Sequence, residues 1–122
     1  MSSPNVKPEV WIWEPDLFFA SRLRQQILGA GCEPKMLRPN APLDADASRP
    51  PKLVVINLDF DLAGALGLLK QIHNHLNADA MTVLGHCGHL ATEIKQQAEA
   101  AGCARVVTNG QLTGAVHQIL AT

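Results

Sequence analysis

Side chains that could take part in chemistry occur at four separate places in this chain. They are the acids Glu14 and Asp16, the amide of Asn57, the Gly-His-Cys-Gly-His cluster at residues 85–89, and Thr108 with Asn109. Paired carboxylates bind hard cations, and imidazole and thiolate groups bind zinc or act as nucleophiles. Asn57 differs from these groups, because an uncharged amide is a very poor nucleophile. What the groups do together depends on the elements that position them.

Short apolar runs alternate five times with segments of helical apolar periodicity. The expected strands cover residues 10–13, 32–37, 53–57, 80–84 and 104–108, and Trp11 and Trp13 share one face of the first. Residues 38–51 contain four prolines, which lack the backbone donor of a helix and leave room for at most one helical turn. The alternation predicts an α/β fold with a parallel sheet, right-handed crossovers and helices on both faces, with the second helix degraded.

All four groups of reactive side chains follow or end an expected strand. In an open parallel α/β sheet, ligands bind at the carboxyl ends of the strands. We therefore expect these side chains to gather at one edge of the sheet.

The pattern of strand-end residues resembles the receiver domain of two-component response regulators. The resemblance rests on acids after the first strand, Asn57-Leu58 at the end of the third, Ala101-Gly102 before the fifth and Thr108 at its end, and it extends over about residues 9–120. It implies a flavodoxin-like, five-stranded parallel sheet in the order 2-1-3-4-5. It also implies a site built from a phosphoacceptor Asp, two acids that hold Mg²⁺, a Thr or Ser after the fourth strand and a Lys after the fifth.

Carried over position by position, the family's functional groups are mostly absent. The phosphoacceptor falls on Asn57, the acidic pair on Glu14 and Pro15 with Asp16 just beyond, the hydroxyl on Gly85 and the Lys on Asn109. The resemblance thus implies a vestigial pocket, whose residues around the degenerate phosphoacceptor position Asn57 are Glu14, Asp16, Gly85, Thr108 and Asn109. We expect no catalytic residue, no cofactor and poor Mg²⁺ affinity there.

A metal or thiol site at residues 85–89 is the weaker interpretation of that cluster. A structural zinc site needs about four ligands at compatible spacing, and His86, Cys87 and His89 have no partner CxxC or HxxxH motif. We predict no bound metal, although a metal- or thiol-dependent enzyme at this loop stays open as an alternative. The other open alternative is a sensor that binds a small molecule or an anion in the vestigial pocket.

Leu17, Phe18 and Phe19 begin the first expected helix. Adjacent helical residues point about 100° apart, so at least one of the three should be exposed. We predict that Phe18 or Phe19 contacts a protein partner or a second copy of the chain. The favoured function is a phosphorylation-independent pseudo-receiver signalling module that acts through protein-protein interaction and is not an enzyme.

Composition limits the partners and the compartment. The 122 residues, 47% of them hydrophobic and 17% charged, suit one domain spanning residues 1–122 with a stable core. The net charge of -1 with scattered Lys and Arg argues against nucleic acid, and no apolar run approaches the ~20 residues of a membrane span. The three cysteines, Cys32, Cys87 and Cys103, suit reduced thiols and a cytoplasmic protein.

Overall fold

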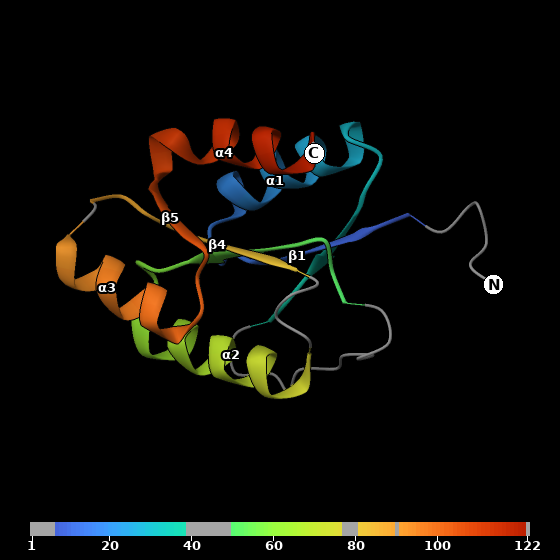
Figure 1. Ribbon diagram of the computed structural model, residues 1–122. Helices are drawn as coiled ribbons and strands as arrows, with labels where there is room; N and C mark the ends of the chain where they lie inside the picture. The colour runs from blue at the N-terminus through green and yellow to red at the C-terminus, as the bar shows by residue number, and fades with distance from the viewer. Residues whose placement is uncertain (1–6, 39–49, 77–80, 90, 122) are drawn as a thin grey trace.

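The computed structural model describes residues 7–38, 50–76, 81–89 and 91–121 (Figure 1). The described residues form five strands, four α-helices and one short 3-10 helix. They are β1 (Glu9–Trp13), α1 (Leu17–Gly29), β2 (Glu33–Met36), β3 (Leu53–Asn57), α2 (Leu62–His75), β4 (Thr82–Cys87), α3 (Thr92–Ala101), β5 (Arg105–Thr108), the short 3-10 helix η2 (Asn109–Gln111) and α4 (Leu112–Leu120). No helix within the described ranges combines the length and the apolar character needed to cross a membrane.

The five strands form one parallel sheet in the order β2-β1-β3-β4-β5. This order and the flavodoxin-like architecture confirm the predicted fold. The expectation of a degraded helix between the second and third strands falls mainly on residues 39–49, which lie outside the described residues.

Helices cover both faces of the sheet, with α1 and α4 on one side and α2 and α3 on the other (Figure 1). Period-two alternation sends Trp11 and Trp13 into the core beneath α2 and α3, and Val10 and Ile12 into the core beneath α1 and α4. All five residues of β3 are buried. A central strand covered on both faces must be apolar throughout, which explains the Leu-Val-Val-Ile run.

The fourth strand is longer than the apolar run that predicted it. It extends three residues beyond Leu84, so the expected end at residue 84 was wrong, and His86 pairs with Asn57 in the register. A Cβ atom on Gly85 would lie 2.9 Å from Leu58 Cδ1 and 3.2 Å from Cys103 Sγ. Glycine therefore allows a close approach inside the strand and does not mark its end.

Candidate functional site

Four polar side chains from four different segments meet at the carboxyl edge of the sheet. Glu14 follows β1, Asn57 ends β3, His86 lies in β4 and Asn109 follows β5. We call these four residues the buried polar cluster, of which Glu14, Asn57 and His86 are buried and Asn109 is half-buried. Each points to the α1/α4 face, because its position continues the alternation of inward residues in its own strand. Glu14, Asn57 and His86 are only 6%, 8% and 0% exposed.

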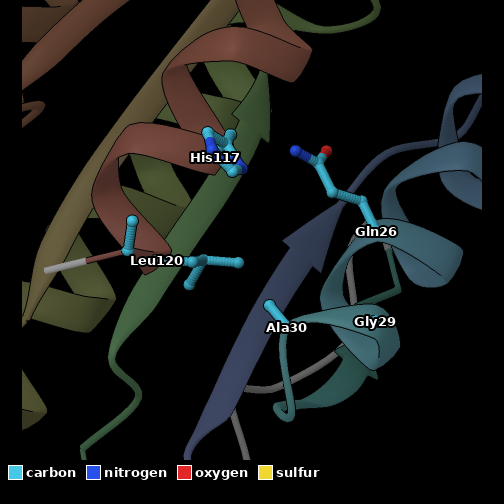
Figure 2. A pocket seen from close by; sticks show the side chains of 6 residues that line it. Gln26, Gly29, Ala30, His117 and Leu120 are labelled. Atoms are coloured by element: carbon cyan, nitrogen blue, oxygen red, sulfur yellow. The ribbon is translucent and has the colours of Figure 1, made fainter.

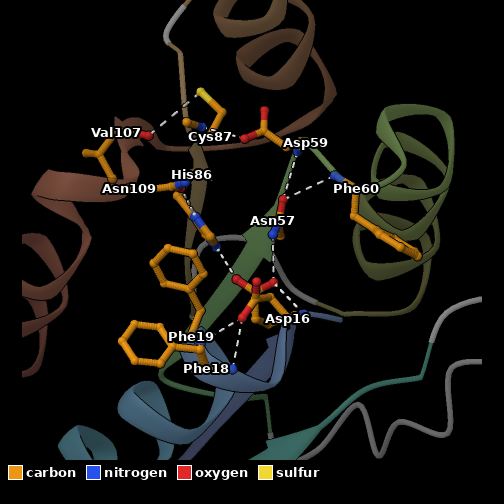
Figure 3. A network of polar contacts seen from close by, with 12 residues as sticks. Asp16, Phe18, Phe19, Asn57, Asp59, Phe60, His86, Cys87, Val107 and Asn109 are labelled. Carbon is orange, nitrogen blue, oxygen red and sulfur yellow. Dashed lines mark hydrogen bonds and ion pairs between the residues drawn. The ribbon is translucent and has the colours of Figure 1, made fainter.

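Direct contacts join the members of the buried polar cluster (Figure 3). Asn57 Nδ2 donates to Glu14 Oε2 at 2.6 Å, and His86 Nε2 lies 2.8 Å from Glu14 Oε1. His86 Nδ1 lies 2.7 Å from Asn109 Oδ1. Glu14 Oε1 and His86 Nε2 have no other partner among the described residues, so each depends on the other. Losing either partner would leave a buried polar group unsatisfied.

The contacts of His86 determine how the buried carboxylate is compensated. Both ring nitrogens face an oxygen acceptor, and a ring that donates from both nitrogens is an imidazolium, which with the Glu14 carboxylate makes a neutral pair. If the Asn109 amide turns to donate instead, a neutral ring can still donate from Nε2 to Glu14. In both arrangements the carboxylate keeps two side-chain donors, which is the condition for burying it.

The Asn57 amide is engaged at both ends. Beyond its bond to Glu14, its Oδ1 accepts from the backbone N–H groups of Asp59 at 2.8 Å and Phe60 at 3.3 Å. These bonds are those of an Asx turn, in which the side chain replaces a backbone acceptor. Asn57 therefore ties the β3–α2 turn to Glu14, and its amide offers no nucleophile.

Phe19 closes the cluster on the α1 side. Its ring centroid lies 5.9 Å from that of His86, and the residue is half-buried. A small cavity of about 110 Å³ lies beside it, with Phe19, Leu112 and Asn109 in its wall. The Phe19 ring thus covers the buried polar cluster on the α1 side, next to this small cavity.

Several residues expected in the vestigial pocket lie elsewhere. Gly85 turns its Cα hydrogen toward Leu58 and Cys103 on the opposite face, which corrects its assignment to the pocket. Thr108 is offset by one position from the inward-facing residues of β5, and its backbone N–H donates to Gln111 Oε1 at 3.1 Å at the start of η2. The Asp16 carboxylate caps α1 by accepting from Phe18 and Phe19 N–H, and its own N–H donates to Glu14 Oε2 at 3.2 Å. Glu14, Asn57 and Asn109 are brought together as expected.

The expected end of the fourth strand at residue 84 put His86 in a loop and outside the predicted pocket, whereas the strand extends to Cys87. Continuing the alternation of β4 past Leu84 would have found it, since Leu84 and His86 face the same side. Phe60 was also missed. It follows the last buried residues of β3 and exposes 60% of its surface.

The residues of the proposed metal or thiol cluster diverge. His86 points to Glu14, Cys87 is buried on the opposite face with Sγ 3.9 Å from the Val107 carbonyl, and His89 is exposed. Burial, and secondarily the charge of Asp59, raises the pKa of the Cys87 thiol, which opposes thiolate formation. Among the residues that the structure describes, no three His, Cys, Asp or Glu side chains are grouped to hold a metal ion.

Phe18 is 66% exposed, which confirms that one of the residues beginning the first helix reaches solvent. Its ring lies 5.6 Å from the Arg22 guanidinium carbon and 6.0 Å from the Phe19 ring. Phe19 is instead a half-buried residue of the core edge.

A separate hollow of about 300 Å³ lies between the carboxyl ends of α1 and α4 (Figure 2). Its walls include Gln26, Ala30, His117 and Leu120. His117 is the only ionisable group among its lining residues, so it offers no acid–base pair or nucleophile.

The order of the strands and the helices on both faces give the chain the fold of receiver domains. No protein-family model and no curated protein sequence matches the chain. Solved structures with the same fold include a response regulator from Thermotoga maritima, at 12% identity and a TM-score of 0.68, with 96% of this chain and 100% of that chain covered. A receiver domain of a DNA-binding response regulator from Colwellia psychrerythraea matches at 20% identity and 0.66, over 94% of this chain and 99% of that one.

A third match reaches a TM-score of 0.75 at 13% identity. It is a response regulator from Burkholderia pseudomallei with a phosphorylated aspartic acid, and the match covers 93% of this chain and 66% of that chain. At these identities the matches show the fold, and the resemblance to receiver domains is confirmed at that level.

Proposed function

We propose that this chain is a phosphorylation-independent receiver-like signalling module that acts through protein-protein contact. The observation that carries the proposal is the bonding of Asn57. Its amide donates to the buried Glu14 carboxylate and accepts from two backbone N–H groups, so the phosphoacceptor position of the fold is occupied by a structural tie. No step of catalysis belongs to the proposed function.

The contacts within the buried polar cluster favour a protein-binding module over a small-molecule sensor. His86 Nε2 and Glu14 Oε1 are each other's contact inside the protein. The Phe19 ring packs against the ring of His86. A ligand would have to displace these contacts and compensate a buried carboxylate. The Phe18 residue, in contrast, is 66% exposed, with the Arg22 guanidinium carbon 5.6 Å from the centroid of its ring.

The proposed partner is a protein or a second copy of the chain, bound in the cytoplasm. Aromatic anchors dominate binding energies at interfaces, which makes Phe18 the first residue to test. The three cysteines are free and buried, and this agrees with a reducing compartment.

The absence of phosphorylation is tested by intact-mass spectrometry after incubation with acetyl phosphate or phosphoramidate and Mg²⁺. The expected result is an unmodified mass, because an amide cannot form the acyl phosphate. A stable phosphoryl adduct on any residue of the buried polar cluster would contradict the proposed function.

The contact role is tested by comparing Phe18→Ala with Leu28→Ala, an exposed apolar residue near the other end of α1. The free energy of unfolding of each variant should lie within about 0.5 kcal/mol of the wild-type value, as is usual for surface substitutions. Phe18→Ala should weaken association by ~1–3 kcal/mol, measured by sedimentation of the purified chain and of its complex with a captured partner. Equal association of both variants would contradict the proposed role of Phe18 as a partner contact.

A further inference from the structure

Two hollows lie one after the other along the seam between α1 and α4. The first is the cavity of about 110 Å³ beside Phe19, and the second is the hollow of about 300 Å³ between the carboxyl ends of the two helices (Figure 2). Gln26 belongs to both walls, and its Nε2 donates across the seam to the Thr113 carbonyl at 2.8 Å. From α1 the walls take Phe19, Arg22, Leu23, Gln26, Gly29 and Ala30. These positions recur at intervals of three and four, so they share one face of α1. We call the two hollows together the α1/α4 groove.

The α1/α4 groove carries cationic groups and no carboxylate. Arg22 and His117 are the ionisable residues among those that line it. Helix α1 contains Arg22 and Arg24 and no acid, and α4 contains no acid either. Asp16 and Glu33, the acids nearest to α1 in the sequence, lie before and after the helix and outside both walls. The charge of the groove therefore favours an acidic ligand over a basic one.

Arg22 has no counter-ion within the part of the chain that the structure describes. No described carboxylate lies at ion-pair distance from its guanidinium group, and its recorded contact is the Phe18 ring, whose centroid lies 5.6 Å from Cζ. A cation–π contact holds the guanidinium group but leaves its charge in place. A carboxylate from a partner would supply the bidentate acceptor that guanidinium groups bind best.

A second copy of the chain is a poor occupant of the groove. In the described helices the exposed large apolar side chains are Leu17, Phe18 and Leu28, which all belong to α1. Helix α1 is therefore the only described helix of a second copy that could offer apolar anchors. It would bring Arg22 and Arg24, with no acid, against Arg22 of the first copy. Like charges brought together at an interface oppose association.

The shape of the groove suits a helix. The two hollows are centred ~10 Å apart along the helix axes, which is about the rise between residues i and i+7 of an α-helix. Gly29 keeps the second hollow open, since nothing lies within 4 Å of a Cβ atom added there. Amphipathic helices dock in such grooves through apolar anchors at these spacings. A flat lipid surface would leave both hollows unfilled.

We propose that the α1/α4 groove binds an amphipathic helix of a partner protein, with apolar side chains at positions i and i+7 in the two hollows and an acidic side chain on Arg22. Phe18 stands beside Arg22 at the same end of the groove. The inference rests on the proposed function and adds to it the binding surface and the chemistry of the partner.

The test adds three synthetic helical peptides to the full ¹⁵N-labelled chain. The first has Leu at two positions seven residues apart with Glu beside each, the second has Lys in place of every Glu, and the third has Ala in place of both Leu residues. The first should shift the amide resonances of Arg22, Gln26, Gly29 and His117, and should bind at least about tenfold more tightly than the other two. Raising the salt concentration from about 0.05 to about 0.5 M should weaken its binding, since exposed charges are screened.

Two pairs of variants test the shape and the charge of the groove. Gly29→Leu fills the second hollow and should lower the affinity for the Glu peptide by about tenfold. Gly67→Leu, at an equally open position of α2 on the other face of the sheet, should change it less than about twofold. Both replace a helical glycine by a better helix former, so neither should lower the unfolding midpoint. Arg22→Glu should reverse the preference between the Glu and Lys peptides, whereas Arg24→Glu, outside the walls, should keep it.

Several results would overturn the inference: shifts that map away from the groove, equal affinity for the Glu and Lys peptides, no binding of either, an affinity unchanged by Gly29→Leu, or self-association through the groove. Co-sedimentation with phosphatidylglycerol vesicles that Gly29→Leu leaves unchanged would assign this face to a lipid surface. The proposed function fails differently, by a phosphoryl adduct or by association that ignores Phe18. A Phe18-dependent association that is insensitive to Gly29→Leu and to Arg22→Glu would preserve the proposed function and refute the helix-binding groove.

Discussion

An amide at position 57 can donate a hydrogen bond to Glu14, whereas a carboxylate there would place a second negative charge beside it. Asn57 Nδ2 lies 2.6 Å from Glu14 Oε2, in a site where both residues are buried. A receiver that uses an Asp at this position must keep that carboxylate free to react. Here Glu14 Oε2 accepts from the Asn57 amide, whereas an ionised Asp at position 57 would offer it no donor.

Asn57→Asp should therefore destabilise the domain by about 1–3 kcal/mol, because it replaces a buried hydrogen bond by two facing carboxylates. It should gain at most weak phosphorylation, since Gly85 supplies no hydroxyl and Asn109 no cation. Urea unfolding and intact mass measure the two outcomes.

The matched control is the exchange Glu14→Gln with Asn57→Asp, which places the donor on position 14 and the acceptor on position 57. The double variant should be more stable than Asn57→Asp alone, with a coupling energy of about 0.5–3 kcal/mol. Additive effects of the two substitutions would mean that the contact between the side chains does not determine stability.

His86 is the partner on which the other Glu14 oxygen depends. Both side chains are fully buried, so His86→Ala leaves a carboxylate without its donor and should cost ~3–5 kcal/mol in the free energy of unfolding. His89 is exposed and lies three residues further along the chain. The free energy of unfolding of His89→Ala should therefore lie within about 0.5 kcal/mol of the wild-type value. Similar unfolding midpoints for the two variants would contradict the buried pair.

At the scale of elements, the start of α1 connects the core to the exposed ring of Phe18. Asp16 accepts from the N–H groups of Phe18 and Phe19 at 2.9 and 3.2 Å, and its own N–H reaches Glu14. The cap satisfies two of the backbone donors that a helix N-terminus leaves open. The same bonds set the direction of Phe18.

Asp16→Ala should lower stability by about 0.5–2 kcal/mol, the usual cost of losing an N-cap. Asp16→Ser keeps a capping oxygen and should recover most of the loss. Thermal or urea unfolding of the three proteins decides the point, and equal destabilisation by Ala and Ser would show that the charge of Asp16 matters more than its cap.

At the scale of the whole molecule, the two cores on either side of the sheet differ in what they contain. The core beneath α2 and α3 holds Cys87 and Cys103, and the core beneath α1 and α4 borders the buried polar cluster. Burial, with a further contribution from Glu99, raises the pKa of the Cys103 thiol to about 12. The thiol is thus favoured over the thiolate in the folded chain.

Stability should therefore fall in alkaline solution. An unfolded cysteine loses its proton near pH 8.5, whereas folded Cys103 keeps it up to about 12. In that window the unfolded state binds fewer protons, so the stability contributed by the neutral thiol is present below about pH 8.5 and is lost as pH rises toward 12. Urea unfolding at several pH values should show a smaller alkaline loss for Cys103→Ala than for the wild type, and parallel curves would contradict the expectation.

Much of the architecture could be predicted from local patterns, because alternation and helical periodicity report which side of an element is buried. The apolar runs located all five strands, and the spacing of Trp11 and Trp13 assigned them correctly to one core. The residue type at position 57 also indicated, without any structure, that the end of the third strand offers an amide and no carboxylate nucleophile. These properties depend on residue type and on neighbours within a few positions.

The composition of the cluster was decided by tertiary structure. Gly85 resembled a strand end, yet β4 continues past it, and this extension turns His86 inward to Glu14, which lies 72 positions earlier in the chain. Phe60 likewise gained its place at the edge from bonds made by Asn57 across the turn. A short sequence window cannot specify such contacts, because they depend on the register between strands and on the crossovers that bring distant strand ends to one edge.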